Sequence, residues 1–104
     1  MNQEIFKQIQ TLKREIIPND ELILFGSQAR GDEKEDSDWD LVVIVDKPKG
    51  NLFEDFSTYA YPFSEIGWDY GVCINPLFYT KEQWEQSEIF PFCQNVTREG
   101  IKID

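Results

Sequence analysis

Hydrophobic and polar positions recur along the first part of the chain with two different periods, and each period predicts a different element. Between residues 2 and 17, Ile5, Ile9, Leu12 and Ile16 follow one another at intervals of four, three and four. That spacing predicts an amphipathic helix, which Pro18 ends. The apolar runs 21–25 and 41–45 are short and continuous. They predict two strands, and the second has the β-branched character of a strand covered on both faces.

Residues 51–79 continue this alternation of helix and strand. Asn51 can cap a helix that stops before Pro62, and its apolar face is formed by Leu52, Phe53, Phe56, Tyr59 and Ala60. Residues 68–74 predict a third strand, broken by the turn signal Asn75-Pro76 and extended after a bend by residues 77–79.

The end of the chain carries helix-boundary signals. Thr80 and Gln83 have the spacing of a capping box, which opens a helix through Trp84. Pro91 suits the first turn of a last helix that ends at Gly100, and residues 101–104 form a tail or an edge strand. The pattern therefore predicts an α/β (α+β) fold, with a small mixed sheet of three to four strands packed against helices.

The length of 104 residues predicts a single domain, residues 1–104, with one core and no room for a separate substrate domain. No apolar stretch reaches membrane-spanning length, and the first residues lack the pattern of a signal peptide. We therefore expect no membrane association and a cytoplasmic setting.

Composition restricts the chemistry further. The net charge is -10 without any basic cluster, which disfavours a long nucleic acid and suits a cationic small molecule or a basic protein surface. The chain has no histidine, so zinc sites and histidine-dependent triads are not expected. Cys73 and Cys93 lie in apolar surroundings and are expected to be buried free thiols. Catalysis would depend on carboxylates, hydroxyls, amines and a metal ion.

Asp38 and Asp40 stand two residues apart at the mouth of the predicted strand 41–45. Because side chains alternate between the faces of a strand, both carboxylates would lie on one face while Trp39 points to the other. Two carboxylates on one face can hold a hard divalent cation such as Mg²⁺, with room for water and phosphate.

A second candidate site feature lies eleven residues before these aspartates. Gly26 ends the strand 21–25 and lets a ligand approach the backbone closely, and Ser27 offers a hydroxyl at the first turn of a helix over residues 27–30. A triphosphate would suit this place, and Arg30 could neutralise charge on the phosphates. If the two strands are neighbours, phosphate cradle and metal ligands would meet. Residues 31–36 are expected to be a solvated charged loop.

The stretches Gly26-Ser27-Gln28-Ala29-Arg30-Gly31 and Ser37-Asp38-Trp39-Asp40-Leu41 together resemble the signature of the DNA polymerase beta-like nucleotidyltransferase superfamily, in its minimal MNT-type branch. The resemblance is dense over residues 24–45. It implies the nucleotidyltransferase fold, with Gly26 and Ser27 holding the triphosphate of an NTP, ATP by family analogy. Asp38 and Asp40 would bind two Mg²⁺ ions. The implied reaction moves a nucleoside monophosphate to a hydroxyl and releases pyrophosphate.

The family also uses a third carboxylate on a neighbouring strand, as a metal ligand that helps to activate the acceptor. Asp69 is the candidate here because it opens the predicted strand 68–74, and Glu65 is the nearest substitute. The family pattern is not matched around Asp69, since Gly71 and Asn75-Pro76 interrupt the predicted strand. Turnover would therefore depend on whether Asp69 reaches the metal site.

The resemblance leaves three functions open. The first is an enzyme that modifies a protein or small-molecule hydroxyl, with a HEPN-type helical partner in a toxin–antitoxin pair, or a homodimer, completing the site. The second is a non-catalytic module that binds nucleotide or a partner. The third is an aminoglycoside-type transferase, against which the missing helical domain counts. The acceptor and the preferred base are not predictable from the sequence.

Overall fold

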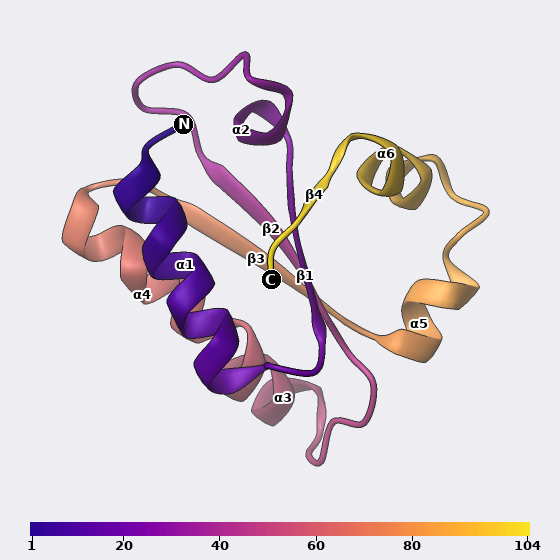
Figure 1. Cartoon of the computed structure of the whole chain (residues 1–104). Helices are drawn as coiled ribbons and strands as arrows, with labels where there is room; N and C mark the ends of the chain where they lie inside the picture. Colours follow the sequence, from indigo (N-terminus) through magenta and orange to yellow (C-terminus); the bar gives the residue numbers. More distant parts are fainter.

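A computed structural model describes residues 1–104 as an alternation of helices and strands (Figure 1). The first half contains α1 (Gln3–Ile16), β1 (Glu21–Phe25), α2 (Ser27–Arg30) and β2 (Trp39–Val45). The second half contains α3 (Leu52–Tyr59), α4 (Tyr61–Tyr70), β3 (Ile74–Thr80), α5 (Lys81–Gln86), α6 (Pro91–Glu99) and β4 (Ile101–Lys102).

The four strands form one sheet in the order β3-β2-β1-β4. β1 is antiparallel to both β2 and β4, whereas β2 and β3 run parallel. The long connection through α3 and α4 allows the parallel pair, because a chain must cross over before it can enter the sheet again in the same direction. The predicted small mixed sheet packed against helices is therefore confirmed, and residues 101–102 form one of its two edge strands.

Helices cover both faces of the sheet, and each face buries its own apolar cluster. Figure 1 shows α1 and α4 on one side of the sheet and α5 and α6 on the other. Alternate residues of β2 divide between the two sides, with Leu41 and Val43 in the α1/α4 cluster and Val42 and Ile44 in the α5/α6 cluster. β2 is thus one of the two inner strands, and it is covered on both faces as its β-branched sequence predicts.

The prediction for residues 68–74 is wrong, since Trp68 to Tyr70 are the last turn of α4 and the strand begins at Ile74. Pro62 does not mark the end of helical structure but lies in the first turn of α4, where a missing N–H costs nothing. Gly71, with φ +67°, ends α4 in the left-handed conformation. β3 then runs through Asn75-Pro76 without a break. Proline is tolerated there because β3 is an edge strand.

Two burial predictions also need correction. Cys93 is buried as expected, but Cys73 is exposed in the turn before β3. Leu52 and Phe53, predicted for the buried face of α3, are 69% and 79% exposed. No helix of the chain has both the length and the apolar character needed to cross a membrane.

Candidate functional site

Asp38 and Asp40 lie where β2 begins, on either side of an anchored tryptophan. Trp39 is 1% exposed and packs in the α1/α4 cluster. Its backbone N–H donates to the backbone carbonyl of Cys73 at 2.9 Å. Asp38 is exposed and Asp40 half-buried. Because Trp39 fixes one side of the strand, the period of two places both carboxylates on the opposite side. In keeping with this placement, the amide of Asn75 reaches both carboxylates.

Gly26 lies directly against Asp40. Antiparallel pairing of β1 and β2 sets Phe25 opposite Asp40, and Gly26 follows with φ +76° as the residue immediately before α2. Having no side chain, Gly26 does not cap α2, so the first N–H groups of that helix have neither an intrahelical nor a side-chain acceptor. Ser27 is half-buried in the same turn. The Gly26-Ser27 turn thus meets Asp40, the second of the two aspartates.

Gln28 connects this turn to the aspartates and was missed by the sequence prediction. Its side chain is 4% exposed, and its Nε2 atom donates to the carbonyl of Ser37 at 3.2 Å. Since Ser37 immediately precedes Asp38, this bond holds the entry to β2 against α2. The Gln28 Oε1 atom is buried without a partner. Nothing in the sequence around Gln28 indicated its burial, because polar residues in short helical turns are usually exposed.

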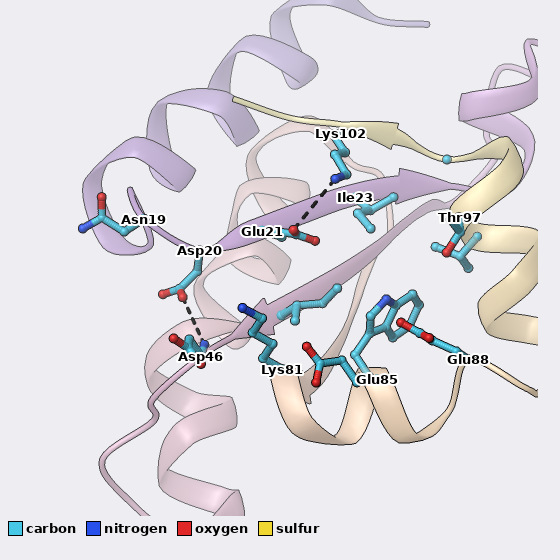
Figure 2. Close-up of a pocket in the computed structure, with 14 residues that line it drawn as sticks. Asn19, Asp20, Glu21, Ile23, Asp46, Lys81, Glu85, Glu88, Thr97 and Lys102 are labelled. Carbon is cyan, nitrogen blue, oxygen red and sulfur yellow. Dashed lines mark hydrogen bonds and ion pairs between the residues drawn. The ribbon is translucent and has the colours of Figure 1, made fainter.

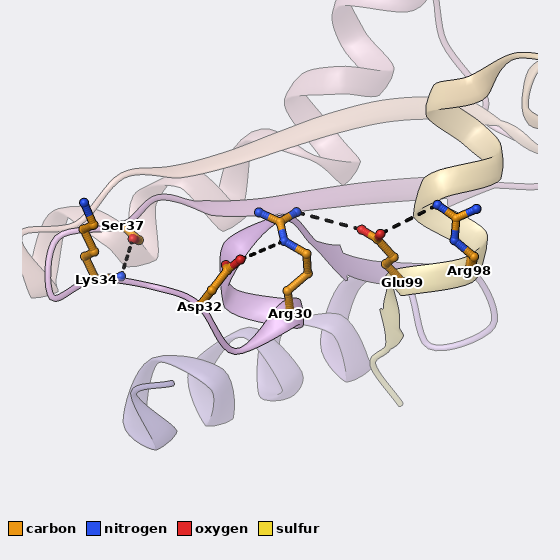
Figure 3. A network of polar contacts seen from close by, with 6 residues as sticks. All are labelled: Arg30, Asp32, Lys34, Ser37, Arg98 and Glu99. Atoms are coloured by element: carbon orange, nitrogen blue, oxygen red, sulfur yellow. Dashed lines mark hydrogen bonds and ion pairs between the residues drawn. The ribbon is translucent and has the colours of Figure 1, made fainter.

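Arg30, predicted as a phosphate ligand, is held by carboxylates from two directions. Its Nε atom is 3.2 Å from Asp32 Oδ2, and its Nη1 atom is 3.9 Å from Glu99 Oε2 at the end of α6. Glu99 also lies 3.7 Å from Arg98, so one carboxylate stands between two guanidinium groups (Figure 3). The Arg30 side chain is 46% exposed. It is therefore accessible, but competing carboxylates surround it.

Asn75 is the second residue that the sequence prediction missed. The parallel register of β2 and β3 sets it beside Asp40. Its Nδ2 atom donates to Asp38 Oδ2 at 3.3 Å and to Asp40 Oδ1 at 3.5 Å, two long hydrogen bonds from one amide. The Oδ1 atom of Asn75 accepts from Cys73 Sγ at 3.2 Å. The sequence does not reveal this role, because Asn75-Pro76 is a turn signal that predicts a strand break.

Asp69 is not part of this arrangement. It lies exposed in the last turn of α4 and, with Glu65, lines a groove against α1 whose other members include Gln8, Thr11 and Glu15. No group of three acidic or thiol side chains in the chain is close enough to hold a metal ion. The expected cluster of Asp38, Asp40 and Asp69 is therefore absent, because Asp69 belongs to a helix and not to the strand beside β2. Glu65 is no substitute for the same reason.

A cavity of about 370 Å³ lies at the other end of the α5/α6 face (Figure 2). Ile23, Ile44, Trp84 and Val96 form its apolar part. Its polar lining includes Asp46, Lys81 and Glu85, but not Asp38, Asp40 or Gly26. The buried contacts of Val42 with the α5/α6 cluster separate the cavity from Asp40. The carboxylate site is therefore distinct from this cavity.

The Asp38–Asp40 pair and the Gly26-Ser27 turn suit a hard cation with phosphate oxygens. The pair supplies two anionic oxygen ligands on one face, and its partial exposure leaves room for water and substrate in the coordination shell. The glycine allows a ligand to reach backbone N–H groups. Within the chain, no third carboxylate joins these residues.

Comparison with known proteins gives one consistent family. Residues 4–102 match the family model described as "Nucleotidyltransferase domain". Two proteins of Methanocaldococcus jannaschii are similar in sequence. "Putative protein adenylyltransferase MJ0604" is 34% identical over 76% of this chain and 72% of its own length. "Putative protein adenylyltransferase MJ0141" is 34% identical over 75% of each.

Solved structures agree at the level of the fold. A toxin–antitoxin crystallised with AMP-PNP superposes with a TM-score of 0.66 and 20% identity, covering 100% of this chain and 73% of the other. A mutant of the toxin–antitoxin MntA-HpeT has a TM-score of 0.64 and 18% identity, covering 95% and 72%.

Proposed function

The chain belongs to the nucleotidyltransferase domain family, and from that premise we propose that it transfers a nucleoside monophosphate from an NTP, with ATP as donor, to a hydroxyl group. Two similar proteins bear the name protein adenylyltransferase, which supports ATP as donor and a protein as acceptor. Residues 1–104 would form a single minimal domain with a cytoplasmic location.

One observation carries the proposal. Gly26, the residue before α2, lies against the carboxylate of Asp40. The Asp38 carboxylate lies close to that of Asp40, since the amide of Asn75 reaches both. A nucleotide whose phosphates reach the backbone at Gly26 and Ser27 would therefore meet both aspartates. Nucleotidyl transfer needs this juxtaposition, because positioning and charge neutralisation supply most of its rate enhancement.

Asp38 and Asp40 are the residues that would hold Mg²⁺. When bound, the ion neutralises phosphate charge and helps to orient the reacting oxygens. The chain offers ligands for one ion, so a second would depend on the nucleotide and acceptor. Gly26 and Ser27 hold the phosphates in place, and Gln28 positions Asp38 through its bond to the Ser37 carbonyl. Arg30 would contact the phosphates after leaving Glu99.

In the proposed reaction, the acceptor hydroxyl oxygen forms a bond to the α-phosphorus while the bond between the α-phosphorus and the oxygen bridging to the β-phosphate breaks. Pyrophosphate leaves, and the hydroxyl proton passes to solvent. The absence of histidine is compatible with this step, because the chemistry requires in-line geometry more than a strong protein base.

A protein partner would supply the acceptor. The structural neighbours are toxin–antitoxin assemblies, and by analogy we propose a HEPN-type helical partner, with a homodimer as the second possibility. The net charge of -10 suits a basic partner surface, and large apolar side chains such as Phe53, Trp68 and Ile89 are exposed.

The test uses ATP labelled on its α-phosphate, Mg²⁺ and the product of the neighbouring gene, where we propose the partner to be encoded. Label should move to that protein, and Asp38→Asn or Asp40→Asn should abolish the transfer. A parallel reaction with γ-labelled ATP should leave the protein unlabelled, which separates nucleotidyl transfer from phosphoryl transfer. Label on the partner from the γ-phosphate would contradict the proposal.

Asn75 supports a second candidate, a module that binds nucleotide without transferring it. The family resemblance implies a third carboxylate beside the pair, and this chain has an amide there. Binding of the non-hydrolysable AMP-PNP together with no transfer to any partner, in the wild type and in Asn75→Asp, would favour this candidate.

A further inference from the structure

The amide of Asn75 connects the two aspartates to a thiol. Its Nδ2 atom lies 3.3 Å from Asp38 Oδ2 and 3.5 Å from Asp40 Oδ1, and its Oδ1 atom lies 3.2 Å from Cys73 Sγ. Asn75 is exposed and pairs with Asp40 in the sheet register. One end of the amide therefore faces the carboxylate pair, and the other end faces the turn before β3.

A divalent cation on the carboxylate pair is incompatible with this orientation of the amide. The NH₂ group carries positive partial charge and occupies the side of the carboxylates on which a cation would be bound. A half-turn about the terminal torsion of Asn75, which is soft and roughly two-fold, exchanges nitrogen and oxygen with little change of shape. The oxygen then faces the pair, and an asparagine carbonyl is an accepted ligand of hard cations.

Cys73 can accommodate either orientation. A thiol is both a weak donor and a weak acceptor, so Sγ can donate to Oδ1 before the half-turn and accept from Nδ2 after it. The partner residue therefore need not move when the amide rotates. Because Asn75 is exposed, water can replace any hydrogen bond lost during the exchange.

We propose that Asn75 is a third, neutral metal ligand, which changes from hydrogen-bond donor to oxygen ligand when a divalent cation binds Asp38 and Asp40; this inference rests on the proposed function. The two carboxylates then match the charge of a single divalent ion. The site holds one resident ion, and any second ion arrives with the charge of the nucleotide phosphates.

The test measures Mn²⁺ binding by electron paramagnetic resonance, with Mg²⁺ as competitor, in the presence and absence of AMP-PNP. Asn75→Ala should weaken Mn²⁺ binding roughly tenfold, at least the effect of losing an outer-shell partner. Asn75→Asp, which replaces the amide by a charged oxygen ligand, should bind more tightly than the wild type. Thermal unfolding of each variant without metal verifies that the fold is retained.

Different results would overturn different claims. If Asn75→Ala binds Mn²⁺ as tightly as the wild type or more tightly, or Asn75→Asp binds it more weakly, the amide is not a ligand and this inference fails. If Asp38→Asn and Asp40→Asn leave Mn²⁺ binding unchanged, or the wild type binds none, the proposed function fails instead.

Cys73 offers a matched pair of variants for the supporting contact. Cys73→Ser keeps a donor and acceptor beside Asn75 and should bind Mn²⁺ like the wild type. Cys73→Ala removes both and should bind a few-fold more weakly. Equal Mn²⁺ affinity of Cys73→Ser and Cys73→Ala would overturn the supporting role of Cys73. The role of Asn75 as a ligand would then depend on the Asn75 variants alone.

Discussion

Gly26 and Asp40 are packed so closely that a Cβ atom on Gly26 would lie 2.6 Å from Asp40 Oδ2. Gly26→Ala should therefore displace the Asp40 carboxylate, in addition to straining a backbone with φ +76°. We expect the transfer rate to fall by roughly two orders of magnitude, since displacement of a reacting group by about 1 Å costs about that much. Single-turnover transfer of α-labelled AMP measures the effect.

Gly31→Ala is the control for this variant. Gly31 also has a positive φ, +81°, but a Cβ there would meet nothing within 4 Å. Gly31→Ala should lose about 1–2 kcal/mol of unfolding free energy from its left-handed conformation. Gly26→Ala should lose about 1–3 kcal/mol, since a ψ of -156° places Gly26 in a region that is essentially restricted to glycine. Only Gly26→Ala should lose activity beyond that, and an equal loss in Gly31→Ala would show that strain and not contact with Asp40 is responsible.

Asp69→Asn should leave both metal binding and transfer unchanged. Asp69 lies in the last turn of α4 against α1, and it forms no three-membered acidic group with Asp38 and Asp40. For Asp69→Asn, Mn²⁺ titration should give the wild-type affinity and the transfer assay the wild-type rate. Asp38→Asn should show neither Mn²⁺ binding nor transfer. A loss of activity in Asp69→Asn comparable to that in Asp38→Asn would restore Asp69 to the site.

The position of Asp40 could be predicted from the sequence, whereas that of Asp69 could not. The alternation around Asp40 was informative because a continuous apolar strand follows it and Trp39 has to be buried. Around Asp69, the residues Trp68, Tyr70 and Ile74 favour a strand locally. The helix forms there because Phe63 and Gly67 pack beneath it at helical spacing, a tertiary contact that local preference does not reveal. The contact of Asn75 with the two aspartates is unpredictable for a related reason, since it depends on the parallel register that sets Asn75 beside Asp40.

Glu99→Gln should strengthen nucleotide binding. Glu99 holds Arg30 from α6, with an Nη1 to Oε2 distance of 3.9 Å. Both side chains are partly exposed, so solvent screening limits the pair to about 0.2–1 kcal/mol, which corresponds to at most a few-fold change in Kd. Calorimetry with AMP-PNP at low ionic strength measures the change, which should diminish as salt is added.

Glu15→Gln is the matched control for Glu99→Gln. It removes the same charge from an exposed position on α1, on the other side of the sheet from α6. If it strengthens AMP-PNP binding as much as Glu99→Gln does, the effect is due to net charge and not to the release of Arg30.

The two thiols should react with a disulfide reagent such as DTNB at very different rates. Cys73 is exposed, whereas Cys93 is 3% exposed in the α5/α6 cluster. Burial raises the pKa of the Cys93 thiol, and the nearby charge of Glu88 acts in the same direction. Because the thiolate is the nucleophile, a raised pKa lowers its fraction at any given pH. At pH 8 one thiol per folded chain should react rapidly, and Cys73→Ser should abolish that fast phase.

Trp39→Ala should destabilise the protein strongly, because Trp39 is 1% exposed and holds the start of β2 in the α1/α4 cluster. Loss of a buried tryptophan costs about 3–5 kcal/mol of unfolding free energy. Trp68→Ala is the matched control, since Trp68 is 67% exposed and its loss should cost no more than about 0.5 kcal/mol. Urea denaturation measures both.

Trp39→Phe should retain most of the stability, but the smaller ring should loosen the start of β2, where Asp38 and Asp40 lie, and weaken Mn²⁺ binding. Wild-type Mn²⁺ affinity in Trp39→Phe would mean that the strand alone, without its buried anchor, is sufficient to hold the carboxylate pair.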